Sequence, residues 1–254
     1  MNVVVLTQDD PFYLGKNLDY LFKKLPFDIN ISATVVFDVS PFGKKETFFQ
    51  KLRKTYSVFG LSFVIHYGIE FLFNKLKPST KVNNVLRKHK IPIIQLQNNI
   101  NKPDSLKIIK SYNPDVLVSI AGNQIFRKSL INLAPKGCIN LHTALLPKYR
   151  GLMPTFWVLN NNEKKTGVSV FFVDEGIDSG SIIIQKEFEI RNHTQKQLIK
   201  ATKKLGMEAV VEALLAIKND SVDLLPNNNA EMTYFSFPTK EDVKDFKKKG
   251  KKFY

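Results

Sequence analysis

Three polar residues are of types that suit chemistry at a carbonyl group. Asn140 and His142 flank one leucine in an apolar stretch, and Asp178 lies 36 residues beyond His142. In an extended strand alternate residues share a face, so the Asn140 amide and the His142 imidazole point the same way. The amide can stabilise a developing oxyanion while the imidazole moves protons, and the Asp178 carboxylate would orient the ring. We therefore predict Asn140, His142 and Asp178 as catalytic residues.

Short apolar runs alternating with helical stretches organise the first half of the chain. These β-branched runs occupy residues 3–6, 31–36, 91–94, 116–120 and 138–141. Such runs predict an α/β fold with a doubly wound, mostly parallel sheet covered on both faces. We expect covering helices at residues 17–24, 105–110 and 124–133. Ligands of such folds bind at the carboxyl ends of the strands, which is where Asn140 and His142 lie.

The second half of the chain changes character. Apolar runs at 168–173 and 181–185 predict two strands around a loop rich in Gly and Asp. A long helix is expected from Thr194, a candidate N-cap, to Lys218. After residues 226–229, Pro238 and Thr239 open a short charged helix. We divide the chain into a catalytic domain at 1–218 and a short C-terminal extension at 219–254.

One segment, Val58–Phe73, is apolar except for a narrow polar stripe. Ser62, His66 and Glu70 lie four residues apart, so they share one face of a predicted helix. This helix belongs to an apolar helical insertion near 45–77, which basic residues flank. A buried helix, a homodimer interface and docking on an anionic membrane through 58–77 are all open interpretations.

The residues from Asn140 to Gly151 closely resemble the signature of folate-dependent formyltransferases, which is Asn-x-His, then Ser-Leu-Leu-Pro-x-Tyr-Arg-Gly, then a glycine-flanked Asp loop. Here the stretch reads Asn-Leu-His-Thr-Ala-Leu-Leu-Pro-Lys-Tyr-Arg-Gly. The resemblance is strong from about residue 115 to 185. Ala144 stands where the family usually has serine, and Phe171 stands where purine-pathway relatives carry a histidine. The resemblance implies a Rossmann-like formyltransferase fold.

The resemblance also implies site residues and a formyl donor. Asn140, His142 and Asp178 match the catalytic trio of the family, and N10-formyltetrahydrofolate is the donor. Residues 119–126 and the loop 173–178 would line the slot for its pterin ring. The predicted donor-binding residues are Ala121, Gly122, Asn123, Gln124, Ile125, Val173, Asp174 and Gly176. No metal is expected, because the four histidines are scattered and there is one cysteine.

The resemblance leaves three possible functions open for the protein, two of which differ in the acceptor of the formyl group. The chain looks most like sugar N-formyltransferases, which act on a nucleotide-linked amino sugar for surface polysaccharide synthesis, including the O-antigen of lipopolysaccharide. Candidate acceptor contacts are Lys148, Tyr149, Arg150 and Trp157, although Arg150 also fits a structural hydrogen-bond donor and Trp157 a core anchor. The second function is formylation of initiator tRNA, whose enzymes carry a further C-terminal domain of about a hundred residues. The third is a basic membrane- or nucleic-acid-binding module without catalysis.

Composition and charge narrow the class of protein. The 254 residues are 43% hydrophobic and 24% charged, which excludes a disordered or collagen-like chain. The net charge of +15 suits a phosphorylated or otherwise anionic partner, although simple solubility explains it too, and we do not favour nucleic acid. Seven lysines against three acidic residues lie between Lys240 and Tyr254. With a lone Cys138 and no apolar leader, we expect a cytoplasmic protein, at the inner face of the membrane if the apolar helix docks there.

Overall fold

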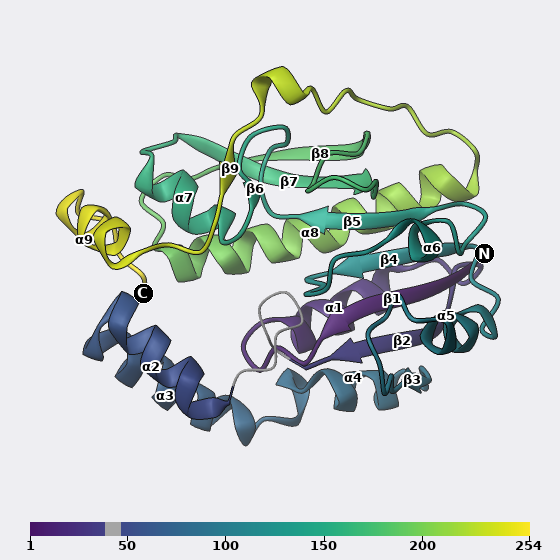
Figure 1. Cartoon of the computed structure of the whole chain (residues 1–254), viewed down its shortest axis with the longest axis horizontal. Coiled ribbons are helices and arrows are strands. Elements are labelled where there is room, and N and C mark those ends of the chain that lie inside the picture. Colours follow the sequence, from purple (N-terminus) through teal and green to yellow (C-terminus); the bar gives the residue numbers. More distant parts are fainter. Residues whose placement is uncertain (39–46) are drawn as a thin grey trace.

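A mostly parallel sheet forms the centre of the computed structural model, which describes residues 1–38 and 47–254 (Figure 1). In this part of the chain the sheet has seven strands in the order β3-β2-β1-β4-β5-β7-β8. The first five in sequence run parallel, whereas β7 and β8 pair antiparallel at one edge. The strands are β1 (Asn2–Gln8), β2 (Asn30–Phe37), β3 (Ile93–Ile94), β4 (Val116–Ile120), β5 (Cys138–His142), β7 (Lys165–Phe172) and β8 (Ile182–Glu189). The predicted fold class is confirmed.

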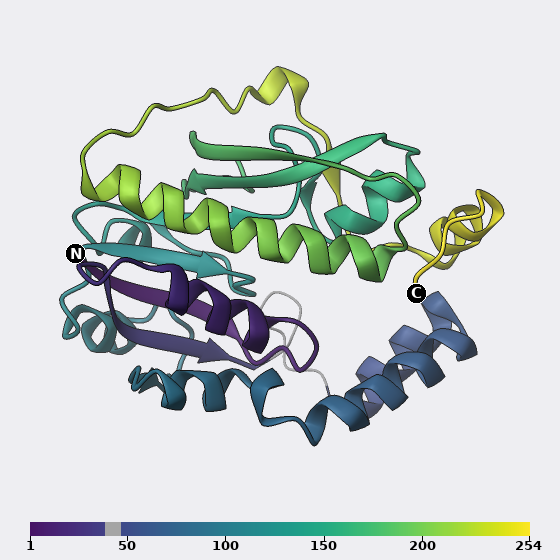
Figure 2. The same ribbon diagram turned by 180° about the vertical axis from the view of Figure 1, so that it is seen from behind.

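Helices cover both faces of the sheet, as its apolar strands require. Val3 and Val5 of β1 pack toward α1 (Leu14–Lys24), α4 (Val82–Lys88) and α8 (Gln195–Lys218), and Figure 2 shows α1 and α8 crossing this face. Val4 and Leu6 point to the other face, toward α5 (Pro103–Lys110) and α6 (Lys128–Ile131). This alternation follows from the two-residue period of a strand.

Several local predictions hold and one helix is shorter than expected. Thr194 caps α8, because its side chain accepts a hydrogen bond from the Gln197 N–H in a capping box. In the predicted helix 124–133, only Lys128–Ile131 is helical. The preceding residues form a loop, because the Gln124 side chain accepts from the Ile100 N–H and the Asn101 side chain donates to the Ile125 carbonyl. These tertiary contacts hold the backbone out of a helix.

The apolar segment forms two helices and not one. We call α2 (Phe48–Phe59) and α3 (Leu61–Lys75), joined at Gly60, the helical hairpin. Gly60 has φ = +86°, which the left-handed region allows for glycine and which ends the first helix. No residue of α3 is buried, so the interpretation as a core helix is wrong. Residues 45 and 46 of the predicted insertion lie outside the described residues, and no described helix is long and apolar enough to cross a membrane.

Besides the apolar cores on the two faces of the sheet, a separate apolar cluster joins the hairpin to the C-terminal segment, residues 219–254. It contains Phe59 at the end of α2, Phe156 of α7 (Pro154–Asn160), and Phe246 of α9 (Lys240–Lys248). Two short strands, β6 (Arg150–Gly151) and β9 (Tyr234–Phe235), pair parallel nearby. The two 3-10 turns of the described chain are η2 (Pro78–Thr80) and η3 (Asn229–Glu231). In Figure 1, α9 and the hairpin lie on the side toward which the parallel strands run.

Candidate active site

Asn140 and His142 lie at the carboxyl end of β5, in the middle of the sheet. Asn140 pairs with Ser119 of β4 on one side and with Phe171 of β7 on the other. Both side chains project from the same face of β5, as their spacing predicts. His142 is buried, whereas Asn140 is half-buried, and none of the hydrogen bonds among the described residues uses the Asn140 side chain. Its amide therefore has both hydrogens available for a ligand.

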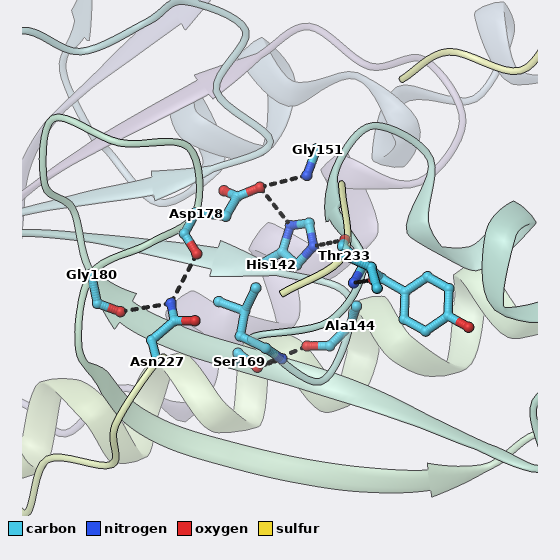
Figure 3. A network of polar contacts seen from close by, with 10 residues as sticks. His142, Ala144, Gly151, Ser169, Asp178, Gly180, Asn227 and Thr233 are labelled. Atoms are coloured by element: carbon cyan, nitrogen blue, oxygen red, sulfur yellow. Dashed lines mark hydrogen bonds and ion pairs between the residues drawn. The ribbon is translucent and has the colours of Figure 1, made fainter. Parts of the chain in front are cut away.

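Two oxygen atoms hold the His142 ring from opposite sides. Its Nε2 is 2.7 Å from the backbone carbonyl oxygen of Tyr149, and its Nδ1 is 3.6 Å from Oδ2 of Asp178 (Figure 3). Because a carbonyl only accepts hydrogen bonds, Nε2 carries the proton in that contact. Nδ1 then faces the Asp178 carboxylate, and the two oxygen contacts together fix the orientation of the ring.

Asp178 reaches His142 because the loop after β7 turns back along the sheet. β7 ends opposite Ile139 of β5, so the loop must return toward the end of β5 where His142 lies. Asp178 adopts φ = +49°, and its Oδ2 accepts a 2.9 Å hydrogen bond from the Gly151 N–H. Asn227 holds the loop from below, since its side chain donates to the carbonyls of Asp178 and Gly180 (Figure 3). The trio predicted from sequence is thus brought together.

The loop that carries Tyr149 is fixed by the buried Ser169 of β7 and the half-buried Gln185 of β8. The Ser169 hydroxyl donates to the Ala144 carbonyl at 2.7 Å and accepts from the Leu146 N–H at 3.1 Å. Gln185 donates to the Leu146 carbonyl and to Ser169. Ala144, where the family usually has serine, therefore keeps its position through its backbone and the hydroxyl of another strand.

The C-terminal segment forms the outer wall of this loop. Thr233 accepts a hydrogen bond from the Tyr149 N–H, and a side chain at Gly151 would collide with the Phe235 carbonyl. Arg150 is 4% exposed, and its guanidinium donates to the side chains of Asn227 and Asn229. Arg150 therefore binds the C-terminal segment to the loop 143–149, as a structural donor would.

The other predicted acceptor contacts divide between exposed and buried side chains. Lys148 is exposed, so it is open to a ligand. Tyr149 is buried, stacks on Phe235 and donates to Glu163 at 2.6 Å; burial and this neighbour raise the pKa of its hydroxyl to about 12. Trp157 is buried too and donates to the Ser236 carbonyl. The contacts of Trp157 are those of a core anchor.

The predicted donor-binding residues lie in two loops beside the carboxyl end of β5 or its neighbouring strands. Ala121 follows the last residue of β4, level with His142, and has φ = +57°. A Cβ at Gly122 would stand 2.7 Å from the Ser119 hydroxyl, so glycine allows the loop to pack closely on Ser119. Asn123 donates to the Asp38 carbonyl, and its buried Oδ1 has no partner among the described residues. Ile125 is exposed.

The second loop orders itself through Asp174. The Asp174 carboxylate accepts hydrogen bonds from the Gly176 N–H at 3.0 Å and from the Ser179 hydroxyl at 2.6 Å. Val173 packs on the core and donates through its N–H to the Cys138 carbonyl. Asp174 thus shapes the loop that ends in Asp178. Within the described ranges, no three His, Cys, Asp or Glu residues are grouped as metal ligands would be.

Sequence reasoning missed the residues that hold the site together. Ser169 and Gln185 are polar positions inside apolar strands, a pattern that could have identified them. Asn227 and Thr233 lie in a polar C-terminal stretch, and nothing local distinguishes them from their neighbours. Their role depends on where that stretch packs.

Comparison with known proteins gives the family and the fold. The formyl transferase family profile matches residues 73–214, more than half of the chain. Methionyl-tRNA formyltransferase of Kosmotoga olearia is 36% identical over 170 residues, which cover 66% of this chain and 54% of that protein. The chain therefore spans about half the length of the curated relatives that it matches.

Solved structures with low sequence identity share the fold. Phosphoribosylglycinamide formyltransferase from Anaplasma phagocytophilum has a TM-score of 0.64 at 15% identity, covering 94% of this chain and 99% of that chain. The N-formyltransferase from Helicobacter canadensis, in complex with folinic acid and dTDP-3-aminofucose, has a TM-score of 0.56 at 18% identity. That superposition covers 92% of this chain and 70% of the other.

Proposed function

The chain belongs to the formyl transferase family, and on this premise we propose that it transfers a formyl group from N10-formyltetrahydrofolate to the amine of a nucleotide-linked amino sugar. The observation that carries the proposal is the convergence of an amide, an imidazole and a carboxylate at the end of β5. Asp178 lies 3.6 Å from His142, and Asn140 projects from the same strand face. This is the set of groups that formyl transfer to an amine requires.

The proposed reaction forms a bond between the acceptor nitrogen and the formyl carbon and breaks the bond from that carbon to the donor nitrogen. One proton leaves the amine and one proton reaches the donor nitrogen. His142 moves this proton through Nδ1, because its Nε2–H is held by the Tyr149 carbonyl. Asp178 supports the imidazolium, and the Asn140 amide donates to the oxygen that becomes negative.

The residues around the trio fit a formyl donor of this class. The loop 121–125 lies at the carboxyl end of β4, and Gly122 lets it pack closely on Ser119 of that strand. The unpartnered Oδ1 of Asn123 offers a buried acceptor, which a ligand donor would satisfy. We propose that this loop and 173–178 hold the donor, which supplies the formyl group.

The acceptor is the finer part of the proposal. Structures that cover more than nine-tenths of this chain include an N-formyltransferase in complex with dTDP-3-aminofucose. Residues 227–235 wall the loop 143–149, so they lie where an acceptor held beside the trio would be recognised. Lys148 is an exposed cation on the loop that these residues wall, and we propose it as a contact for an anionic group of the acceptor.

A second candidate acceptor is initiator methionyl-tRNA. The identity of 36% to a methionyl-tRNA formyltransferase favours it, and the net charge of +15 suits a polyanion. Both candidates use the same formyl donor and the same trio, so the acceptor alone distinguishes them.

The decisive experiment measures tetrahydrofolate release from N10-formyltetrahydrofolate with a panel of acceptors. The panel contains 3-amino and 4-amino deoxysugars on dTDP and UDP, and charged initiator tRNA. We expect turnover with an amino sugar and none with tRNA. Turnover with tRNA alone would overturn the acceptor and leave formyl transfer in place.

A binding titration separates the remaining outcomes. If no acceptor in the panel gives tetrahydrofolate release but folinic acid binds, the amino-sugar acceptor is contradicted. Silence without folate binding would contradict formyl transfer itself and favour a binding module. His142→Ala serves as the matched control, since it removes the imidazole and leaves the donor loops unchanged.

A further inference from the structure

The outer face of the helical hairpin is apolar and uncovered. Leu61, Ile65, Ile69, Leu72 and Leu76 recur at helical spacing along α3 and its C-cap, and they form one stripe. Their side chains are between 51 and 81% exposed. On α2, Phe48, Phe49, Leu52 and Tyr56 are exposed as well. A patch of this extent on a folded chain marks a surface that another partner covers.

The inner face of α3 carries the polar residues. Glu70 forms a 2.8 Å ion pair with Lys196 of α8, and the His66 ring stacks on Tyr254 with centroids 3.7 Å apart. Asn74 accepts from the Thr80 hydroxyl through its backbone carbonyl. The same side of α3 also carries Phe63, which packs on Phe59 and Phe253, and Tyr67, which packs on Phe12. The leucine and isoleucine stripe lies apart from these inward contacts and faces outward. Packing against the body of the protein does not explain the stripe.

Basic residues surround the apolar stripe. Lys75 lies in the last turn of α3 and Lys77 follows it, and both are exposed. At the other end of α3, Lys240 and Lys244 of α9 line the same surface hollow as Leu61. None of the ion pairs among the described residues involves these four lysines.

We propose that the helical hairpin docks the protein on the surface of an anionic lipid bilayer. An apolar face bordered by lysines is the pattern of helices that lie in the membrane interface with their apolar side among the acyl chains. The lysines then meet the anionic headgroups, each adding to the attraction. The helices of the described chain do not cross a membrane, which agrees with docking in the interface plane.

The positive charge of the protein favours an anionic bilayer over a second copy of the chain as the partner of the apolar stripe. Two copies would bring two lysine-bordered faces together, and each carries part of a net charge of +15. Like charges at such an interface oppose association, whereas an anionic surface attracts both the lysines and the whole molecule. The bilayer is therefore the partner that matches the stripe and its border together.

Vesicle flotation of the full chain tests the proposal without any assay of activity. The vesicles are phosphatidylcholine alone or phosphatidylcholine with phosphatidylglycerol. One variant combines Ile65→Ser, Ile69→Ser and Leu72→Ser, and another combines Lys75→Glu with Lys77→Glu. Two matched controls lie on α5, at the far end of the molecule in Figure 1. The first is Ile108→Ser, and the second combines Lys107→Glu with Lys110→Glu.

We expect the unmodified chain and both controls to float with phosphatidylglycerol vesicles and not with phosphatidylcholine alone. The serine variant loses binding, and the glutamate variant binds roughly tenfold more weakly or worse. Binding by the serine variant as strong as that of the unmodified chain would overturn the assignment. Absence of vesicle binding would overturn it too, and a dimer that the serine substitutions dissociate would identify a second copy as the occupant. If the serine variant fails to fold, the glutamate pair and its α5 control decide the question.

Discussion

The loop 143–149, beside the proposed catalytic trio, and the helical hairpin differ in what surrounds their polar and apolar side chains. Around the loop 143–149, the side chains of Ser169 and Arg150 are buried, and the Ser169 hydroxyl and the terminal nitrogens of Arg150 hydrogen-bond to groups of the chain itself. In the hairpin, His66 and Glu70 face inward beside aromatic residues such as Phe59 and Phe63, but the stripe from Leu61 to Leu76 has no internal counterpart and remains exposed. The polar groups of the first region are held by other parts of the same chain, whereas the exposed stripe of the second is the surface that we propose a lipid bilayer covers. The difference separates a site that must be rigid from a surface that must be accessible.

The largest effect is expected at the trio. Asp178→Asn keeps an oxygen that can accept from the Gly151 N–H but removes the charge that supports the His142 imidazolium. We expect kcat to fall roughly 10²- to 10⁴-fold. The tetrahydrofolate-release assay measures this, and Asp223→Asn, at an exposed position of the C-terminal segment, is the control. Normal turnover with unchanged folate binding would remove Asp178 from the mechanism.

A matched pair of leucine substitutions tests the contrast between interior and exposed apolar residues. Leu18 of α1 is 0% exposed and Leu72 of α3 is 63% exposed. Leu18→Ala should lower the free energy of unfolding by about 3–5 kcal/mol, because it leaves a cavity. Leu72→Ala should change it by less than about 0.5 kcal/mol. Urea unfolding measures both, and a large loss for Leu72→Ala would show that the outer face of α3 is covered in solution.

The buried polar network gives an intermediate effect. Ser169→Ala leaves the Leu146 N–H and the Ala144 carbonyl without their partner in the interior. We expect a loss of about 1–3 kcal/mol in the free energy of unfolding. Ser181→Ala, at an exposed position one residue before β8, is the control, and it should lie within about 0.5 kcal/mol of the unmodified chain. Equal values for both serines would mean that the loop is held by other contacts.

The smallest effect is expected for a surface ion-pair cluster. Lys23, Lys88 and His89 hold the pKa of Asp19 well below its usual value. A lowered pKa in the folded state stabilises the protein above the unfolded pKa, and this contribution disappears as the pH falls below about 4. Asp19→Asn should cost about 0.5–1 kcal/mol at neutral pH. Unfolding measured at pH 7 and at about pH 3 checks this, since the difference between variant and unmodified chain should shrink in acid.

Much of the fold could be predicted from local patterns. The β-branched runs predict the strands because each is buried on both faces, and Thr194 predicts the start of α8 because its side chain caps a free N–H. The predicted helix at 124–133 is mostly a loop because Gln124 and Asn101 form bonds to residues far along the chain or in another segment. Local propensity contains no information on such bonds.

The residues proposed to carry the chemistry were predicted from sequence, but the residues that hold them in place were not. Asn140 and His142 share a face because of the two-residue period of a strand, whatever the rest of the chain does. Tyr149, Arg150 and Trp157 were predicted as acceptor contacts, yet their side chains are buried against the C-terminal segment. That packing joins residues some eighty positions apart, which no local pattern reveals.

By itself the sequence determined that Asn140 and His142 share one face of a strand. It also determined the alternation of strands and helices and the polar stripe of the apolar helix. These depend on periodicities of two and of 3.6 residues, which are properties of neighbouring residues. Only the tertiary structure decided that Asp178 returns to His142 and that the polar stripe of α3 faces Lys196 while its leucines face outward. A periodic pattern defines the faces of an element, but which face is turned inward depends on what the rest of the chain packs against it.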